Sequence, residues 1–487
     1  MDVLIGIDVG SSNLKVAAFD RQGRLVASGQ RGYDTVRPLI SPPPHSEPRP
    51  ERGFVEQDPE EWIDLCGEII REMLAAGAFR PEDVRGIAPT GRGSGASFVD
   101  GEGRVLMRHY TDGRAGPQHR ELVARFGPEA DNRALASKTL HLKQEHPDLF
   151  ARMRYPLCVH DFLLFRLSGV VATDPSSGPR TPDAIWPRDV WEWIGVPYEN
   201  VPPVRPHTDI VGTLLSDTAA RLGLPPGIPI GNGGHDGACA NIGAGAISIG
   251  QVCMTMGTNG VARSISSFPA QQIPWRGISA YHYLPGRWCC GGDASYAGAV
   301  ATWLSRIVGG THDELEAEAR VVPPGSHGVT FLPFLGGQIA PERRSEARGA
   351  YLGMSIDTNR AVLYRATMEG VGYLYRSIER RLEEMDLGEG EWRVSGGGAK
   401  SPLWMRIMAS LLERQLLITE PEEGPRGAAM VTAVGLGWYR TVEECGAEWV
   451  RIVQRVDPDR ALTEAYLPHY ARYTAYADAV YRVEAQS

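Results

Sequence analysis

Short apolar runs separated by small polar turns mark the beginning of the chain. Residues 3–7 and 14–19 are runs of this kind, and residues 8–13 between them hold an aspartate, a glycine and two serines. Short apolar segments bounded by glycine and small polar residues are typical of a β-hairpin. We therefore predict strand, tight turn and strand, with a third strand over 24–29.

Helical periodicity appears next. Asp58 can cap a helix whose first residue is Pro59, and apolar side chains then recur at helical spacing, which predicts a helix over 59–76. Similar patterns predict helices at 360–385, 403–413 and 427–439, and closing helices in the tyrosine-rich end of the chain. The tyrosines there, which we expect to serve packing, are Tyr466, Tyr470, Tyr473, Tyr476 and Tyr481.

The hairpin pattern returns in the second half of the chain. Residues 251–256 and 261–265 are strand candidates on either side of a Gly-Thr-Asn-Gly turn. A β-hairpin followed by helices, occurring twice, predicts an α/β protein of two related domains that face one cleft. We expect the domains to be 1–248 and 249–487.

Charge and composition narrow the function classes. The 487 residues carry a net charge of −9 and no long basic run, which argues against nucleic acid or an anionic membrane as partner. The start of the chain lacks the pattern of a signal peptide, and the weakly polar stretch 238–256 is a poor membrane span. Seven scattered cysteines and dispersed histidines favour a reducing, cytoplasmic location and give no support for a structural zinc site.

Three glycine-containing turns are candidates for binding phosphate or nucleotide. In the first, backbone amides and the hydroxyls of Ser11 and Ser12 can donate to phosphate oxygens, while the Asp8 carboxylate can hold hydrated Mg²⁺. The second turn is 256–260, and the third is 394–400, where three glycines follow an apolar strand and let a ligand approach the backbone. Each turn alone can also be an ordinary structural turn.

The order of these turns resembles that in the FGGY family of carbohydrate kinases, relatives of hexokinase and actin. The resemblance covers nearly the whole chain. Further matching segments are Val55–Trp62, Lys138–Pro147, Asp161–Gly169, Gly234-His235-Asp236, Arg348–Gly353, Ala366–Gly370, Gly397–Trp404 and Gly427–Ala429. The family implies two actin-like, ribonuclease H-like domains around a central cleft, ATP and Mg²⁺ as cofactors, and a small sugar or polyol as substrate.

The resemblance also implies roles for individual residues. Asp236 matches the catalytic base, since a carboxylate must accept the proton of the sugar hydroxyl as that hydroxyl attacks phosphorus. Asp8 matches the metal-associated carboxylate. The residues that match the ATP-binding positions are Asp8, Gly10, Ser11, Ser12, Lys15, Gly257, Thr258, Gly298, Thr302, Gly397, Gly398 and Ala399.

Departures from the family pattern concern the substrate. Xylulokinases carry His where this chain has Ser94, between Gly93 and Gly95, and Trp where it has Tyr110. This version is similar to that in L-xylulose and tetritol kinases. Arg92 offers a fixed fork of donors for adjacent hydroxyls or for the carboxylate of a sugar acid. We therefore expect Arg92, Gly93, Ser94, Tyr110 and Asp236 to bind the substrate, a pentulose such as xylulose first and a tetritol or pentitol second.

Two other functions remain open at the level of sequence. One is a phosphohydrolase on the same fold, which would not need a sugar-sized polar pocket beside Asp236. The other is a sugar sensor without activity, which should have lost Asp8 or Asp236, and both are present. A homodimer is compatible with the family.

Overall fold

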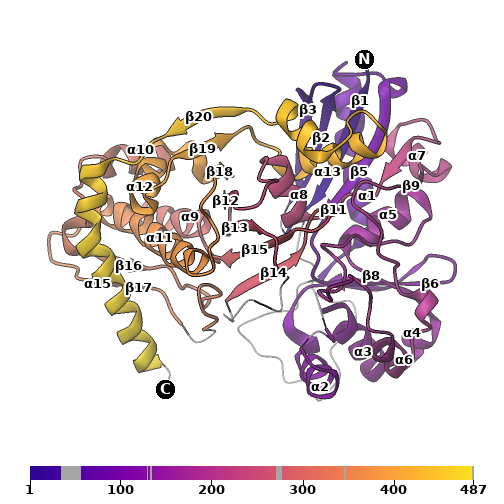
Figure 1. Ribbon diagram of the computed structural model, residues 1–487, viewed down its shortest axis with the longest axis horizontal. Helices are drawn as coiled ribbons and strands as arrows, with labels where there is room; N and C mark the ends of the chain where they lie inside the picture. The colour runs from indigo at the N-terminus through magenta and orange to yellow at the C-terminus, as the bar shows by residue number, and fades with distance from the viewer. Residues whose placement is uncertain are drawn as a thin grey trace. The chain divides into compact units, whose positions relative to one another are not determined.

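A computed structural model describes most of the chain (Figure 1). The described residues are 1–11, 13–33, 56–128, 130–131, 134–269, 272, 277–344 and 347–484. They divide into two compact units. The first unit comprises Met1–Gly243, Tyr281–Leu284 and Glu422–Trp449, and the second comprises Ala244–Ala280, Pro285–Pro421 and Val450–Ser487.

A seven-stranded sheet forms the centre of the first unit. Its strands are, in spatial order, β3 (Leu25–Gly32), β2 (Asn13–Asp20), β1 (Val3–Val9), β5 (Val84–Gly91), β10 (Pro229–Gly231) and β9 (Ile210–Thr213), with β11 (Gly234–His235) also paired to β5. Strand β1 runs antiparallel to β2 and parallel to β5. Six of the seven residues of β1 are buried, because helices cover both faces of this part of the sheet.

Helices of the first unit pack on this sheet. They are α1 (Pro59–Ala75), α5 (Val159–Ser168), α7 (Ser216–Leu222), α8 (Asp236–Gly243), α13 (Glu423–Gly435) and α14 (Val442–Trp449). Helices α8 and α13 approach so closely that a Cβ at Gly243 would lie 1.8 Å from the carbonyl oxygen of Glu423. A Cβ at Gly427 would lie equally close to the carbonyl oxygen of Cys239. Glycine at these positions therefore lets a distant segment of the chain join the first unit.

A smaller four-stranded sheet extends the first unit. Its order is β4 (Glu56–Gln57), β7 (Val105–Tyr110), β6 (Ala96–Asp100) and β8 (Met153–Leu157). The neighbouring helices are α2 (Gly116–Phe126), α3 (Leu135–Glu145), α4 (Pro147–Arg152) and α6 (Arg188–Ile194). Their apolar side chains form a separate core that includes Phe98, Leu140 and Trp191.

The centre of the sheet in the second unit repeats the pairing of the first, an antiparallel hairpin followed by parallel strands, whereas the strands at its edges follow in a different chain order. This sheet runs β14 (Ile278–His282), β15 (Trp288–Asp293), β13 (Gly260–Ser266), β12 (Val252–Met256), β18 (Trp392–Ser395), β19 (Leu416–Thr419) and β20 (Ile452–Val456). A two-stranded sheet joins β16 (Thr330–Leu332) to β17 (Ala350–Leu352). The helices are α9 (Gly298–Val308), α10 (His312–Ala319), α11 (Arg360–Glu383), α12 (Pro402–Leu412) and α15 (Arg460–Glu484).

Most elements predicted from the sequence are present. The first three strands, the repeated hairpin and the helices α1, α11 and α12 are confirmed. Tyr466 and Tyr473 of α15 are buried in the core of the second unit. Helix α13 begins at Glu423, before the predicted start at 427. No helix in the described parts of the chain is long and apolar enough to cross a bilayer.

The division into units differs from the expected one, in which the chain passes from the first domain to the second once, between residues 248 and 249. The first crossing lies at Gly243, and residues 281–284 and 422–449 return to the first unit. The reason for the second return is the close packing of α13 against α8 and β1.

Candidate active site

Side chains capable of chemistry gather at the carboxyl ends of parallel strands in the first unit. Asp8 lies near the end of β1, opposite Thr90 of β5, and Arg92 directly follows β5. Strand β11 pairs with the end of β5 and leads directly into Asp236, the first residue of α8. The carboxyl edge of a sheet is where open α/β folds bind their ligands.

The Asp8 side chain is partly buried, and its carboxylate is incompletely satisfied. Its Oδ1 has no hydrogen-bond partner among the described residues. Burial and the charge of Asp236 raise the pKa of Asp8 to about 7, although nearby Lys15 opposes the shift. A buried carboxylate oxygen without a partner is a costly arrangement that a bound cation relieves, and Mg²⁺ takes oxygen ligands of this kind. The residue present therefore fits the implied metal ion.

Lys15 and two glutamates complete the charged surroundings of Asp8. Lys15 lies opposite Asp8 across the β1–β2 pair. Burial opposes the charge on Lys15, but Glu423, Glu422 and Asp8 together raise its pKa. A Cβ at Gly424 would lie 2.5 Å from Oδ2 of Asp8, so the start of α13 must lie against this carboxylate.

Glu422 and Glu423 were not predicted from the sequence. They are more than four hundred positions away from Asp8 in the chain, and no local motif marks them. Their approach depends on the glycine-mediated packing of α13 onto the first unit.

Asp236 is held by two donors and partly open to solvent. Its Oδ1 accepts the backbone N–H of Gly237 at 2.6 Å and lies 2.9 Å from Nε2 of His235. The side chain of Asp236 is 33% exposed, whereas that of His235 is 8% exposed. A carboxylate that is fixed through one oxygen and still reachable has the geometry of a general base.

A buried polar network fixes His235. The His235 backbone N–H donates to Oγ of Ser176 at 3.2 Å, and the imidazole packs edge-on against Tyr281 with ring centroids 5.1 Å apart. The Ser176 hydroxyl donates in turn to Asp174, whose Oδ1 also lies 3.1 Å from Nε2 of His207. These hydrogen bonds therefore hold in place His235, the residue directly before Asp236.

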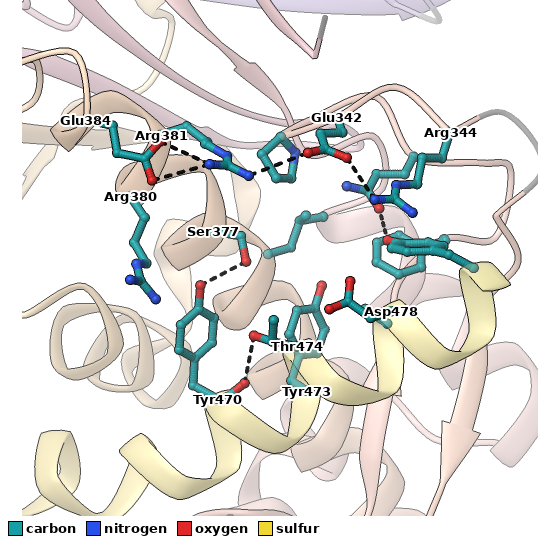
Figure 2. A pocket seen from close by; sticks show the side chains of 16 residues that line it. Glu342, Arg344, Ser377, Arg380, Arg381, Glu384, Tyr470, Tyr473, Thr474 and Asp478 are labelled. Carbon is teal, nitrogen blue, oxygen red and sulfur yellow. Dashed lines mark hydrogen bonds and ion pairs between the residues drawn. The ribbon is translucent and has the colours of Figure 1, made fainter. Parts of the chain in front are cut away.

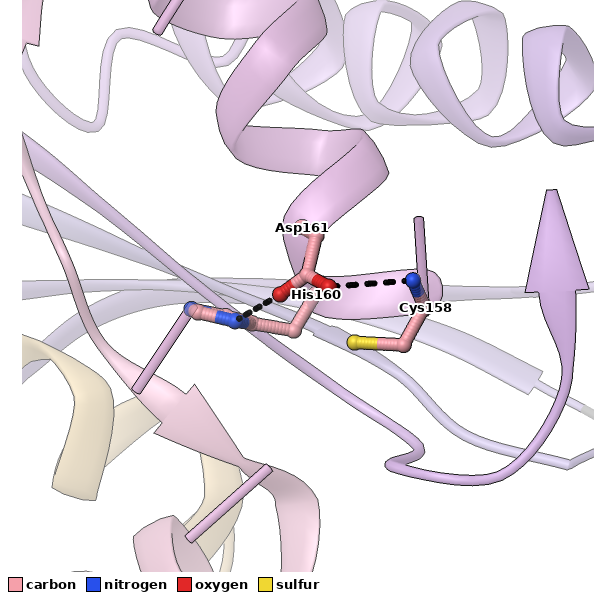
Figure 3. A group of neighbouring side chains, drawn as sticks. All are labelled: Cys158, His160 and Asp161. Atoms are coloured by element: carbon pink, nitrogen blue, oxygen red, sulfur yellow. Dashed lines mark hydrogen bonds and ion pairs between the residues drawn. The ribbon is translucent and has the colours of Figure 1, made fainter. Parts of the chain in front are cut away.

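Cys158, His160 and Asp161 form a buried cluster near this network (Figure 3). Their possible ligand atoms lie within 4.8 Å of one another. Asp161 accepts the backbone N–H of Cys158 at 3.1 Å and faces Nδ1 of His160 at 3.3 Å, while Nε2 of His160 contacts the carbonyl of Asn232. Burial also raises the pKa of the Cys158 thiol well above its usual range. These bonds give the cluster a structural role at the start of α5.

The predicted substrate residues differ in accessibility. Arg92 is buried and donates from Nη2 to Oε1 of Gln57 at 2.6 Å, while its Nε has no partner among the described residues. Gly93 is buried and Ser94 is exposed. Arg92 thus has a donor left for a ligand, and Ser94 is open to one.

Tyr110 does not have the open phenol that was expected. Its side chain is 0% exposed, and its hydroxyl lies 3.3 Å from Nδ1 of His141. Lys138 and Arg114 approach the Tyr110 ring to 4.3 and 4.4 Å from its centroid. Burial lowers the pKa of Lys138 to about 8 and that of His141 to about 4. Tyr110 is therefore part of the interior of the small sheet, where Lys138 and Arg114 lie over its ring.

The first phosphate-type turn is described except for Ser12, which lies outside the described residues. The N–H of Gly10 donates to the carbonyl of Asn13 at 3.0 Å, which closes the turn. Ser11 is exposed, and its carbonyl accepts Nε2 of Gln57 at 3.2 Å. The turn is therefore formed and its serine is accessible.

The corresponding turn of the second unit is supported by α9. The N–H of Gly298 donates to the carbonyl of Gly257 at 2.8 Å, and that of Ala299 to the carbonyl of Thr258 at 3.1 Å. A Cβ at Gly298 would lie 2.7 Å from the same Gly257 oxygen, so glycine is required for this approach. The hydroxyl of Thr302, one turn further along α9, faces His312 at 3.3 Å.

The late glycine turn follows β18. Gly396 has φ +92°, and a Cβ there would lie 2.7 Å from the carbonyl of Met256. Gly398 also lies against Met256, and the N–H of Ala399 donates to the Gly396 carbonyl at 3.1 Å. A Cβ at Gly397 would meet no atom within 4 Å. The residue of this turn that has positive φ is thus Gly396 and not Gly397.

The predicted residues fall into two groups. Asp8, Gly10, Ser11, Lys15, Arg92 and Asp236 lie at one edge of the first sheet. Gly257, Thr258 and Gly298 gather at the matching edge of the second sheet, together with 397–399. Two sheets with the same central pairing, with small-residue turns at both carboxyl edges and carboxylates at that of the first, are typical of phosphotransferases of the actin-like class.

Comparisons with known proteins agree with this class. The model of the N-terminal domain of the FGGY family of carbohydrate kinases matches residues 3–243, and that of the C-terminal domain matches residues 247–436. The chain belongs to the FGGY family of carbohydrate kinases, and the expected resemblance and fold class are confirmed. It is accordingly an ATP-dependent phosphotransferase that acts on a small carbohydrate.

Individual relatives match over nearly the whole length. A xylulose kinase of Bacillus subtilis (strain 168) is 30% identical over 472 residues, which are 93% of this chain and 92% of that protein. A gluconokinase of the same strain is 25% identical over 468 residues, 90% of this chain and 87% of its own. The solved xyloylose kinase of Brucella ovis has a TM-score of 0.86 and 26% identity, and the match covers 99% of this chain and 100% of that one.

Proposed function

We propose that the chain transfers the γ-phosphoryl group of ATP to a terminal hydroxyl of a pentulose, xylulose first, with Asp236 as general base. The observation that carries the proposal is the Asp236 carboxylate itself, which is fixed through Oδ1 and partly exposed at the edge where Asp8 lies. The relatives named xylulose kinase support the choice of substrate. A tetritol, a pentitol and gluconate are the alternatives within the family.

In the proposed reaction the hydroxyl of the sugar gives its proton to Asp236 as its oxygen bonds to the γ-phosphorus. The bond from phosphorus to the bridging oxygen breaks, and ADP leaves with the electron pair. His235 and the Gly237 N–H would orient the Asp236 carboxylate toward the sugar hydroxyl. This positioning would contribute to the rate.

Asp8 is the residue that would hold Mg²⁺, directly or through water. The ion, when bound with ATP, neutralises charge on the transferring phosphoryl group. Lys15 and Ser11 would contact phosphate oxygens through an ammonium group and a hydroxyl, and Gly10 would shape the turn through its bond to Asn13. We assign Ser12 to the same turn from the sequence alone.

The second unit would hold the rest of the nucleotide. Gly257 and Thr258 would contact phosphate, and the open space at Gly397 supports an adenosine site formed with Gly398 and Ala399. Gly298 would support the phosphate turn through its bond to Gly257. Thr302 would contact nucleotide once its hydroxyl exchanges His312 for the ligand.

Substrate choice would depend on Arg92 and the residues after it. The unpartnered Nε of Arg92 suits a hydroxyl or a carboxylate, which is why both a pentulose and gluconate fit. Gly93 and the exposed Ser94 would leave room beside the sugar, and Tyr110 would act by holding the pocket in shape. The free, buried state of all seven cysteines supports a cytoplasmic enzyme, and a homodimer is the assembly we propose for it.

A screen for ADP release with xylulose, L-xylulose, erythritol, xylitol, gluconate and glycerol tests the proposal. We expect xylulose to give the highest kcat/KM and ATP turnover without a sugar to be low. Asp236→Asn should lower kcat by on the order of 10²–10⁴, whereas Asp217→Asn, an exposed acid in the first turn of α7, should leave it unchanged.

Two results would overturn the proposal. ATP turnover that is fast and indifferent to every sugar would indicate a phosphohydrolase, and sugar binding without turnover would indicate a sensor. An Asp236→Asn variant with more than about a third of the wild-type activity would remove Asp236 as the base.

A further inference from the structure

A hollow lies within the second unit, lined by none of the residues proposed for catalysis. It encloses about 270 Å³ between the last turns of α11, the later half of α15 and residues 334–344 (Figure 2). Side chains from all three segments line it, among them Arg344, Arg380, Arg381, Tyr473 and Asp478. This volume approaches that of sites for small metabolites.

Ion pairs hold one wall of the hollow. Glu342 accepts Arg344 at 2.8 Å and lies 3.5 Å from Arg381, which also pairs with Glu384 at 3.0 Å. The Arg344 guanidinium stacks over the ring of Tyr481 at 4.0 Å. A wall whose charges are already paired is shaped in advance and does not need a ligand to form.

Other groups in the hollow lack partners. The Tyr473 side chain is 3% exposed, and its hydroxyl, which lines the hollow, has no hydrogen-bond partner among the described residues. Within the same residues, neither Arg380 nor Asp478 has an ion pair, and they lie at opposite ends of the hollow (Figure 2). Burial keeps the Tyr473 phenol protonated by raising its pKa well above the usual range, so its hydroxyl can donate to an acceptor that enters the hollow.

These groups define the chemistry of a ligand. Arg380 and Asp478 are exposed charges at the rim of the hollow, and the Tyr473 hydroxyl is a neutral donor beside them. A guanidinium binds a phosphate or carboxylate through two parallel bonds, and a carboxylate accepts from hydroxyl groups. We infer that the hollow binds a small hydroxylated anion, either a sugar phosphate or a sugar acid, with the anionic group on Arg380 and hydroxyls toward Asp478 and Tyr473.

Binding there would connect two helices of the second unit. Arg380 belongs to α11, and Tyr473 and Asp478 belong to α15. A ligand that contacts both helices stabilises the folded unit in proportion to its occupancy. Because this effect is measured without ATP and without turnover, the inference does not rest on the proposed function.

Thermal unfolding of the full chain with four probes tests the inference. Xylulose 5-phosphate and gluconate represent the two sources of the anionic group, xylitol the hydroxyls alone and inorganic phosphate the anion alone. At about ten times the dissociation constant, the fitting probe should raise Tm by about 2–4 °C, and xylitol and phosphate should raise it less.

Variants separate this hollow from the active site. Tyr473→Phe removes only the hydroxyl, and Arg380→Gln removes the charge from an exposed side chain. Each should abolish most of the ligand-induced rise in Tm, whereas Tyr476→Phe, on the same helix but outside the hollow, should retain it. Comparing the rise in Tm, and not Tm itself, removes any effect of the substitution on stability.

Three outcomes would overturn the inference. The first is a rise that persists in both Tyr473→Phe and Arg380→Gln, because the probe would then bind elsewhere. The second is an equal rise with xylitol or with inorganic phosphate alone. The third is no rise with any probe.

Discussion

Substitution of Gly397 tests the nucleotide site without disturbing the fold, because no protein atom occupies the space that a side chain there would take. An added Cβ meets no protein atom within 4 Å, and the backbone there does not have positive φ. Gly397→Ala should therefore fold normally. Its neighbour Gly396 cannot serve the same purpose, since φ +92° and the nearby Met256 carbonyl make any side chain disruptive.

The expected loss of ATP affinity follows from what lies beside Gly397: no protein atom occupies the space, but bound adenosine would. If adenosine fills the space beside Gly397, a methyl group there overpacks the complex at a cost of about 1–3 kcal/mol. That corresponds to roughly 5- to 150-fold weaker ATP binding, since about 1.4 kcal/mol is a factor of ten. Gly397→Val should exceed this loss, because its two further methyl groups need more of the same space.

Coupled ADP release at saturating sugar gives KM for ATP, and calorimetric titration with a non-hydrolysable ATP analogue gives Kd. Gly101→Ala is the matched control, because a Cβ at Gly101 also meets no atom within 4 Å and its backbone is ordinary. Unchanged ATP affinity in folded Gly397→Ala and Gly397→Val would show that the late glycine turn is structural only.

Three further predictions concern the first unit. Replacing His235 with Leu should lower kcat by about 10- to 100-fold while KM for ATP stays constant, because Asp236 loses its orienting partner. His235→Gln keeps an N–H donor and should recover most of the rate. Equal losses of kcat in both variants would refute the orienting role. The raised pKa of Asp8, about 7, implies a contribution to the stability of the metal-free protein that is present in acid and lost as pH rises through 7. In EDTA, Tm of the wild type relative to Asp8→Asn should therefore fall by about 2–4 °C between pH 6 and pH 8, and a constant difference would contradict the shift. Ser94→His should move the ratio of kcat/KM toward D-xylulose over tetritols; an unchanged ratio in steady-state assays would make position 94 a spacer.

The elements that could be predicted from the sequence are those determined locally. The hairpin turns, the cap of α1 at Asp58 and the glycines after β18 have signals within a few residues, and the structure contains them. The order of these signals also led to the correct family. Asp236 was chosen as the candidate base for the same reason, since it belongs to a short motif, and its role stays a proposal.

The parts that were missed depend on long-range packing. The approach of Glu422 and Glu423 to Asp8 requires α13 to return to the first unit, which no local pattern reveals. The family motif that contains Tyr110 likewise gives no sign that Lys138 and Arg114 lie over its ring. Periodicity indicates that a residue is buried but does not identify the charges that surround it.

The repeat explains how one architecture supports two different tasks. Equivalent positions can be read from the strand pairs: Asp8 lies opposite Thr90 and Thr255 lies opposite Ser395, each just before its turn. Arg92 lies two residues after Thr90, and Gly397 lies two residues after Ser395, so Arg92 in the first unit corresponds to Gly397 in the second. The first unit therefore has charged side chains at these two positions, the Asp8 carboxylate of the proposed metal site and the Arg92 guanidinium of the proposed sugar site. The second has small, neutral residues at those places, which suits a flat ligand recognised by the backbone.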